Sequence, residues 1–388
     1  MSFPGFDADL VSDTLSLFSH DGRSVTLPLP RGLFPSDTNI ERVAVRPGAR
    51  EALIGLPGGV EAAVELRADR PPSYDFRRGR KVVYLDQNHW STIAAAQQGN
   101  PRVSERDAVA AKEILAQVTA GTVVLAASAG HFVETGPLYG APRLALASTV
   151  LSLSRGWQMR NPLHVRRDEL RFGLERRLPV AENVFAPNAD ELFASSQNAD
   201  RAYGLPAPLA EIASELVGVL GLYDALVDRE AIPNEGGEAA AASWAESFRD
   251  LSEQLRTHGA GRDMVRRVSH ARLILDVYDE LLPLGDSLRL SADEVVDRLT
   301  TPDDPIAAMP FLSRVRAVLF ARLRNVGQSW EANDLFDIMF LCCATGYADV
   351  VVGERRSVGY LRQARNVSPG ANLASTLEEG VAALANCS

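Results

Sequence analysis

The stretch that most constrains the fold lies at residues 81–90, where a strand-like apolar run ends on an aspartate. The run reads KVVYLD, and the polar QNH that follows leads into a helical, alanine-rich segment. A second apolar run lies at 122–127, and helical patterns at 104–121 and after Ser128 alternate with the two runs. This order predicts parallel strands with crossover helices, whose ligands bind beyond the strands' carboxyl ends. We therefore expect Asp86 to point into a crevice.

The α/β pattern returns near the end of the chain, which predicts a main domain that is split in sequence. Helices are expected at 334–345, 357–365 and 376–384, a buried strand at 349–352 and an edge strand beginning at Val367. Helical spacing also marks residues 208–227, 238–257, 262–282 and 310–324. The predicted organisation is a small β-rich N-terminal module at 1–75, the halves of a parallel α/β domain at 81–140 and 326–388, and a large all-α insertion at 141–325.

The charge balance restricts the partners of the chain. With 40 basic and 50 acidic residues, the net charge of -10 argues against a broad nucleic-acid-coating surface and leaves room for a local basic groove. The densest basic stretch runs from Arg155 to Arg177. It is either a surface that follows RNA phosphates or a solvated helix face, where Asp168 and Glu175 pair with neighbouring arginines. The sequence leaves both interpretations open.

The cysteines and the hydropathy bear on the compartment. Cys342 and Cys343 are adjacent in an apolar helical run, so we expect buried thiols rather than a disulfide or a zinc site. No segment has the pattern of a signal peptide, and no apolar run approaches membrane-spanning length. The expectation is a soluble cytoplasmic protein with no membrane partner.

Acidic residues recur where strands end and helices begin. Asp86 ends the first strand, the segment NDLFD at 333–337 opens a helix, and the segment ADVVVGE at 348–354 surrounds a strand. Mg²⁺ and Mn²⁺ prefer carboxylate oxygens and water as ligands. Grouped acids therefore indicate a metal site, and a metal held by acids indicates phosphodiester chemistry.

Taken in this order, the pieces resemble the PIN-like nuclease superfamily. The match consists of VVYLD at 82–86, Glu134 on the helix after the second strand, DIMFLCCA at 337–344 and ADVVVGE at 348–354. The family places acids at the end of the first strand, on an early helix, at the start of a later helix and often after the next strand. Carried over, these are Asp86, Glu134, Asp337 and Glu354, with Asp334 and Asp349 as near alternates. The resemblance covers about residues 81–140 and 330–370, and Glu354 stands where the family usually has Asp.

The resemblance implies an α/β/α sandwich with a parallel sheet and a metal-dependent endoribonuclease that cleaves single-stranded RNA. Asp86 and Asp337 would be the central Mg²⁺ or Mn²⁺ ligands, and Glu134 and Glu354 would complete the shell directly or through water. Asn88, Arg355 and Arg356 are expected to contact substrate. By resemblance the protein would be a toxin or phage-defence effector, with an inhibitory or activating protein partner and possible homo-oligomers.

Each acid also has a structural interpretation. Asp86 can cap the helix that follows it, and Asp334 and Asp337 favour a helix dipole whatever their function. Glu134 and Glu354 can be solvated surface residues. Two functional alternatives stay open: a structure-specific DNA nuclease on the same fold, and a non-catalytic protein that keeps the fold as a binding scaffold.

Overall fold

The computed structural model contains two compact units. Unit 1 comprises Met1–Val82, Trp90–Met159 and Phe185–Pro233, and unit 2 comprises Val83–His89, Arg160–Val184 and Asn234–Ser388. The structure describes residues 5–19, 21–29, 34, 38–46, 51–67, 74–135, 140–178, 180–187, 223, 226–227, 237–300, 305–325, 327, 329–365 and 367–387.

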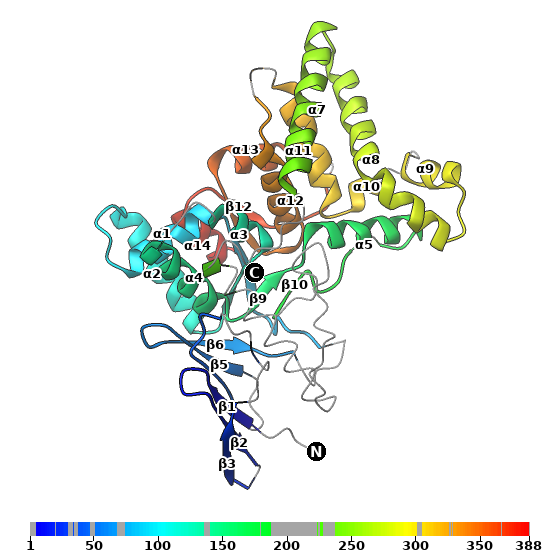
Figure 1. The fold of residues 1–388 in the computed structure, drawn as a ribbon. Coiled ribbons are helices and arrows are strands. Elements are labelled where there is room, and N and C mark those ends of the chain that lie inside the picture. Colours follow the sequence, from blue (N-terminus) through cyan, green and yellow to red (C-terminus); the bar gives the residue numbers. More distant parts are fainter. Residues whose placement is uncertain are drawn as a thin grey trace. The chain divides into compact units, whose positions relative to one another are not determined.

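Unit 1 begins with an antiparallel sheet, which is the β-rich module that the sequence predicts (Figure 1). Its strands are β1 (Gly5–Asp9), β2 (Thr14–Phe18), β3 (Ser24–Pro28), β4 (Arg42–Val45), β5 (Glu51–Leu56) and β6 (Val60–Glu65), in the order β3-β2-β1-β4-β5-β6. Alternation along β5 places Ala52, Ile54 and Leu56 in the core. Gly58 and Gly59 turn the chain between β5 and β6 with φ of 82° and 76°, a left-handed conformation that glycine adopts without strain.

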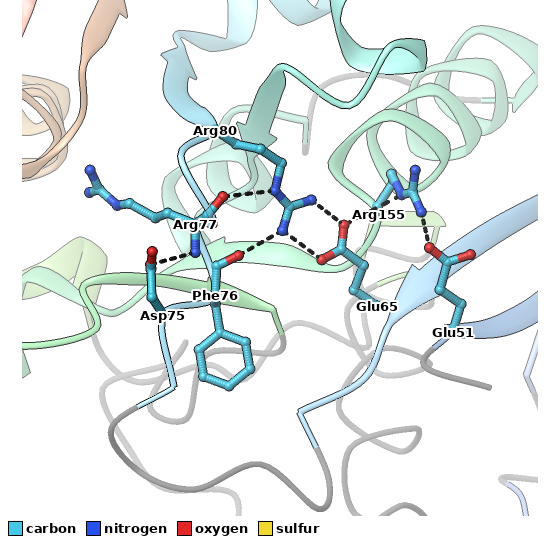
Figure 2. Close-up of polar contacts among 7 residues, drawn as sticks. All are labelled: Glu51, Glu65, Asp75, Phe76, Arg77, Arg80 and Arg155. Atoms are coloured by element: carbon cyan, nitrogen blue, oxygen red, sulfur yellow. Dashed lines mark hydrogen bonds and ion pairs between the residues drawn. The ribbon is translucent and has the colours of Figure 1, made fainter. Parts of the chain in front are cut away.

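An ion-pair network joins β6 to the segment that follows the module (Figure 2). The Arg80 guanidinium donates to both carboxylate oxygens of Glu65, at 2.6 and 2.9 Å, and lies 5.0 Å from the centroid of the Trp157 ring. Arg155 lies 3.6 Å from the same carboxylate and also pairs with Glu51. Burial alone would raise the pKa of Glu65, but its hydrogen bond to Arg80 and the charge of that arginine hold it below its usual value. Charge therefore ties the module to its neighbours in unit 1.

The remainder of unit 1 combines helices with short strands. These are α1 (Gln87–Gln97, from Trp90 onward), α2 (Glu105–Thr119), β8 (Val123–Ala126), α3 (Ala129–Thr135), α4 (Gly140–Ser154), β9 (Trp157–Met159) and β10 (Phe185–Pro187). Ser104 caps α2 as expected, because its hydroxyl accepts the Asp107 N–H at 3.1 Å. β9 and β10 pair antiparallel, so the prediction that residues 141–325 are purely helical is wrong here. The helix predicted at 208–227 lies almost wholly outside the described residues.

A parallel sheet carries the end of the first predicted strand. Its order is β12-β11-β7-β8, where β7 is Lys81–Leu85, β11 is Val350–Val352 and β12 is Asn372–Ala374. β11 pairs in parallel with both β7 and β12, and Val352 lies opposite Leu85. The predicted parallel α/β arrangement is confirmed at this level. All residues of β11 and residues 82–85 of β7 are buried, as strands covered on both faces require.

Three helices of unit 2 follow the predicted pattern around this sheet. They are α12 (Ala332–Tyr347), α13 (Arg355–Gln363) and α14 (Leu377–Ala385). Thr376 caps α14 by accepting the Glu379 N–H at 3.1 Å. The outer strand begins at Asn372 instead of Val367, since Pro369 has no N–H to contribute to a strand ladder.

The helical part of unit 2 matches most of the predicted helices. It consists of α5 (Pro162–Leu174), α7 (Gly237–Thr257), α8 (Arg262–Ser287), α9 (Ala292–Thr300), α10 (Pro305–Ala308) and α11 (Leu312–Arg324). α7 and α8 form a helical hairpin with a short connection at 258–261 (Figure 1). α8 continues past the predicted end at 282, with Pro283 tolerated in its final turns. None of the described helices is long and apolar enough to cross a membrane.

A buried carboxylate fixes the start of α11. Glu169 of α5 accepts the N–H groups of Phe311 and Leu312 at 2.7 and 2.9 Å, and the Tyr347 hydroxyl donates to it at 2.6 Å. Complete burial raises the pKa of Glu169 to about 7, although these donors favour the ionised form. Glu169 thus satisfies backbone donors that the first turn of a helix leaves unpaired.

Candidate acid site at the ends of two parallel strands

Two of the predicted acids are joined at the carboxyl ends of neighbouring parallel strands. Asp86 directly follows β7, and its N–H donates to the carbonyl of Val352 at 2.9 Å, which extends the ladder by one residue. The Asp86 Oδ2 then accepts the N–H of Glu354 at 3.2 Å, two residues beyond β11. The Asn88 side-chain amide donates to the Glu354 Oε1 at 3.0 Å. The sheet therefore positions Asp86, Asn88 and Glu354 as one hydrogen-bonded group.

Asp86 combines a local and a long-range role. Its Oδ1 accepts the N–H of Gln87, the first residue of α1, at 2.9 Å, which is a local contact at the start of that helix. Its Oδ2 is held by Glu354 from the neighbouring strand, which capping does not require. Burial raises the pKa of Asp86 and the charge of Glu354 adds to the rise, although the two N–H donors oppose it. A positive ion near this buried carboxylate would relieve the unfavourable charge.

Asp337 brings a third acid into the same electrostatic environment. It lies on α12, one turn after the helix begins, and it is partly buried. Burial, together with the charges of Asp86, Glu354 and Asp334, raises its pKa to about 7 against the opposing charge of Arg322. A small cavity of about 20 Å³ lies beside Asp337, and we call it the Asp337 hollow. Mutual repulsion of this kind is typical of carboxylates arranged to bind a cation.

Asp334 has a different environment from Asp337, although the two are three residues apart. Its carboxylate receives Arg322 at 2.6 Å and Arg356 at 3.3 Å, and it also accepts the N–H of Glu331 at 2.7 Å. The Arg322 guanidinium lies 4.2 Å from the centroid of the Trp330 ring. Asp334 therefore neutralises two arginines and forms, with Glu331, the capping box at the start of α12. Its oxygens are committed to these partners in this arrangement.

Asp349 lies at the other end of β11 from this group, and Glu134 belongs to the other unit. Asp349 precedes β11, so the length of the strand separates it from Glu354 at the opposite end. Its carbonyl accepts the N–H of Asn372 at 2.9 Å. Glu134 is an exposed residue of α3 in unit 1, whereas Asp86, Asp337 and Glu354 belong to unit 2. The acid site of unit 2 therefore consists of these three carboxylates.

The arginines expected to contact substrate flank the acid site on α13. Arg355 and Arg356 are the first two residues of that helix and are exposed. Arg356 is also the second arginine on Asp334, so it has a structural contact besides any role with substrate. Arg322 was not singled out from sequence. A buried arginine within the apolar pattern of residues 312–324 is the signal that could have marked it.

The donor set has the chemistry of a hard divalent cation site. Carboxylate oxygens are the ligands that Mg²⁺ and Mn²⁺ prefer, and the pKa values of Asp86 and Asp337 are raised first by burial and then by neighbouring acids. Over the described ranges, no three His, Cys, Asp or Glu side chains already lie close enough together to hold one ion. The side-chain types therefore suit the cation, whereas their described positions do not by themselves form a closed set of ligands.

Comparisons with known proteins place no relative beside this chain. A scan against protein-family models, a search of curated proteins and a search of solved structures each gave no significant match.

Proposed function

We propose that this protein is a metal-dependent phosphodiesterase that cleaves single-stranded RNA as an endoribonuclease. The observation that carries the proposal is the joining of Asp86 and Glu354 at the ends of neighbouring parallel strands, with Asp337 electrostatically coupled to both. Ligand sites in parallel α/β sheets lie at this edge. Buried, mutually repelling carboxylates are costly for the fold, which supports a functional reason for keeping them together.

The three acids would have different roles in binding the cation, depending on how firmly each carboxylate is held. Asp86 is anchored by two N–H donors and would be the fixed ligand for Mg²⁺ or Mn²⁺, with Asp337 as the second ligand. Glu354 is exposed and held by Asn88, so it would bind directly or through a water. The bound cation supplies a Lewis acid and lowers the pKa of water at the site. Arg355 and Arg356 would hold the phosphate oxygens of the substrate.

The biological setting follows from the PIN-like resemblance. The protein would act in the cytoplasm on cellular or phage RNA, as a toxin or defence effector. A nuclease of this kind would be restrained or activated by a protein partner or by self-association. Unit 2 carries large helical elements next to the sheet in sequence, and these would provide the regulatory or substrate-selecting surface.

A cleavage assay with the purified full chain tests the proposal. End-labelled single-stranded RNA would be incubated with Mn²⁺, Mg²⁺ or EDTA, with Asp86→Asn and Asp337→Asn beside the parent. We expect metal-dependent cleavage that falls by about 100-fold or more in both variants. Asp349→Asn is the matched control, because it alters an acid next to the same strand at its opposite end.

The outcomes separate the alternatives. Cleavage that persists in EDTA or in Asp86→Asn would contradict the proposal. Preference for structured DNA over RNA would support the DNA nuclease. A folded protein that binds Mn²⁺ but cleaves neither RNA nor DNA would support the non-catalytic scaffold.

A further inference from the structure

Unit 2 contains a second site-like feature, a cavity of about 750 Å³ whose lining is strongly cationic. We call it the arginine cavity. α8, α11 and α13 supply most of its lining. Six of the sixteen lining residues are arginines, and His270 adds a further basic side chain. The arginines are Arg262, Arg266, Arg267, Arg316, Arg324 and Arg365. Among the described residues, no Asp or Glu lines the cavity.

Helical spacing explains how the cations converge. On α8, Arg262, Arg266 and His270 recur every four residues and so share one face. On α11, Arg316 and Arg324 are eight residues apart and also share a face. Lining residues next to them are often small, as the alanines at positions 317, 321 and 364 show, so the cavity stays open between the long side chains.

Carboxylates of the described residues neutralise the three cavity arginines of α8 only weakly. Arg262 and Arg267 make no ion pair or hydrogen bond with any residue that the structure describes. Within the described ranges, the ion pair of Arg266 is with the exposed Asp263, at 3.8 Å. The guanidinium groups of Arg266 and Arg324 lie 5.7 and 5.6 Å from the Phe320 ring centroid. In a chain with 50 acidic and 40 basic residues, a cavity whose charged lining residues are all basic is not a consequence of composition.

We propose that the arginine cavity binds a small organophosphate of nucleotide size that carries several negative charges. Guanidinium forks match phosphate oxygens in geometry and charge, and several of them on one cavity suit a di- or triphosphate. The volume lies within the range of small-molecule sites. Phe320, Tyr360 and Leu299 add apolar lining that a sugar or a base would contact. Six guanidinium groups that line one cavity favour a compact ligand over an extended strand.

This inference does not depend on the proposed nuclease activity. The acid site and the arginine cavity have different ligands and different chemistry. The two sites are neighbours, because Tyr360 of α13 lines both the arginine cavity and the Asp337 hollow. Binding to the arginine cavity is therefore measured in metal-free buffer, where the acid site has no cation. A failure of the nuclease proposal would leave this test intact.

Calorimetric titration of the full chain with ATP, inorganic triphosphate, adenosine and a short single-stranded RNA tests the cavity. ATP and triphosphate are expected to bind, and adenosine is not. A protein carrying both Arg266→Glu and Arg324→Glu should bind ATP about tenfold or more weakly. Arg249→Glu, the same type of substitution made once on the exposed surface of α7, should bind like the parent. Single Arg324→Gln should weaken binding in the same direction, which guards against misfolding of the double variant.

The results have defined meanings. Equal affinity for triphosphate and ATP would show that the phosphates alone are recognised, and tighter binding of ATP would add the nucleoside; both support the proposal. Absence of binding by both compounds, or equal binding to the parent and the double variant, would overturn it. Binding of the RNA alone would also overturn it, because the cavity would then be part of a path for a nucleic-acid backbone.

Discussion

Two aspartates on one helical turn of α12 show how environment, and not residue type, sets the electrostatics of an acid. Asp334 is neutralised by Arg322 and Arg356, whereas Asp337 faces the charges of other acids. A carboxylate paired with arginine stabilises the fold. A carboxylate placed among other carboxylates costs stability until a cation arrives.

Asp334→Asn should therefore destabilise the protein without removing cation binding. The substitution leaves the buried Arg322 without its 2.6 Å partner, so we expect the free energy of unfolding to fall by about 3 kcal/mol. Urea denaturation measures the change, and a Mn²⁺ titration of the same variant should match the parent. Loss of Mn²⁺ binding with unchanged stability would make Asp334 a ligand instead.

Asp337→Asn should have the opposite pair of effects. Removing a charge that Asp86 and Glu354 repel should raise the free energy of unfolding at pH 8 by on the order of 1 kcal/mol, after allowance for partial exposure. Mn²⁺ should then no longer raise the melting temperature. Thermal denaturation at pH 8 with and without Mn²⁺ gives both values, and a destabilised variant that still responds to Mn²⁺ would refute this view of Asp337.

At the scale of elements, close packing of α12 against the start of α11 depends on a glycine. A Cβ added to Gly346 would lie 2.9 Å from the carbonyl carbon of Pro310 and 3.0 Å from its oxygen. Backbone atoms cannot move away as the end of a flexible side chain can. Gly346→Ala is therefore expected to lower the free energy of unfolding by about 1–3 kcal/mol.

Gly359 provides the matched control for this prediction. It lies inside α13, and a Cβ added there meets nothing within 4 Å. Gly359→Ala should raise the free energy of unfolding by up to about 1 kcal/mol, because alanine loses less conformational entropy in a helix. Urea denaturation of both variants gives the comparison. Equal effects at the two positions would contradict the packing described for α12.

The elements that the sequence predicts well are those with local signals. The caps at Ser104 and Thr376 and the helices α7, α11, α12 and α14 follow from spacing and end residues. The sequence does not predict the strands β9 and β10, because a segment of three residues is too short to show a period of alternating apolar residues. These two strands are defined by their pairing with each other, and the pattern of residues along the sequence does not show which segments pair.

At the scale of the whole molecule, the same division holds between local and long-range features. Asp86 at a strand end was predictable, since an acid after an apolar run has a local signature. The pairing of Arg322 with Asp334, the contact of Glu169 with the start of α11 and the arginine cavity join residues that are far apart in sequence. Their partners are defined only by the fold, so sequence spacing could not reveal them.

The pH dependence of stability should reflect the buried acids. The pKa values of Glu169 and Asp337 are both raised to about 7 in the native state, so the native protein retains protons that the unfolded chain releases above about pH 4. Stability should then fall as pH rises from about 4 to 7, by on the order of 3 kcal/mol for the fully buried Glu169. Carboxylates with lowered pKa values, such as Glu65, change the stability only at pH values below this range.

Urea denaturation at pH 5, 6, 7 and 8 checks this expectation. The midpoint should decline across the series and level off above pH 8. Asp337→Asn should flatten part of the decline, while Asp349→Asn should leave it unchanged. A midpoint that rises between pH 5 and 7 would contradict the pKa shifts of these acids.

Binding of Mn²⁺ to the full chain is the most direct test of the acid site. Calorimetry at pH 8 should detect a site in the parent that is lost in Asp86→Asn and in Asp337→Asn and retained in Asp334→Asn. Because the pKa of Asp337 is about 7, affinity should fall about tenfold between pH 8 and pH 6. A parent protein that binds no Mn²⁺, or an Asp86→Asn variant that binds it with unchanged affinity, would contradict a cation site at the ends of β7 and β11.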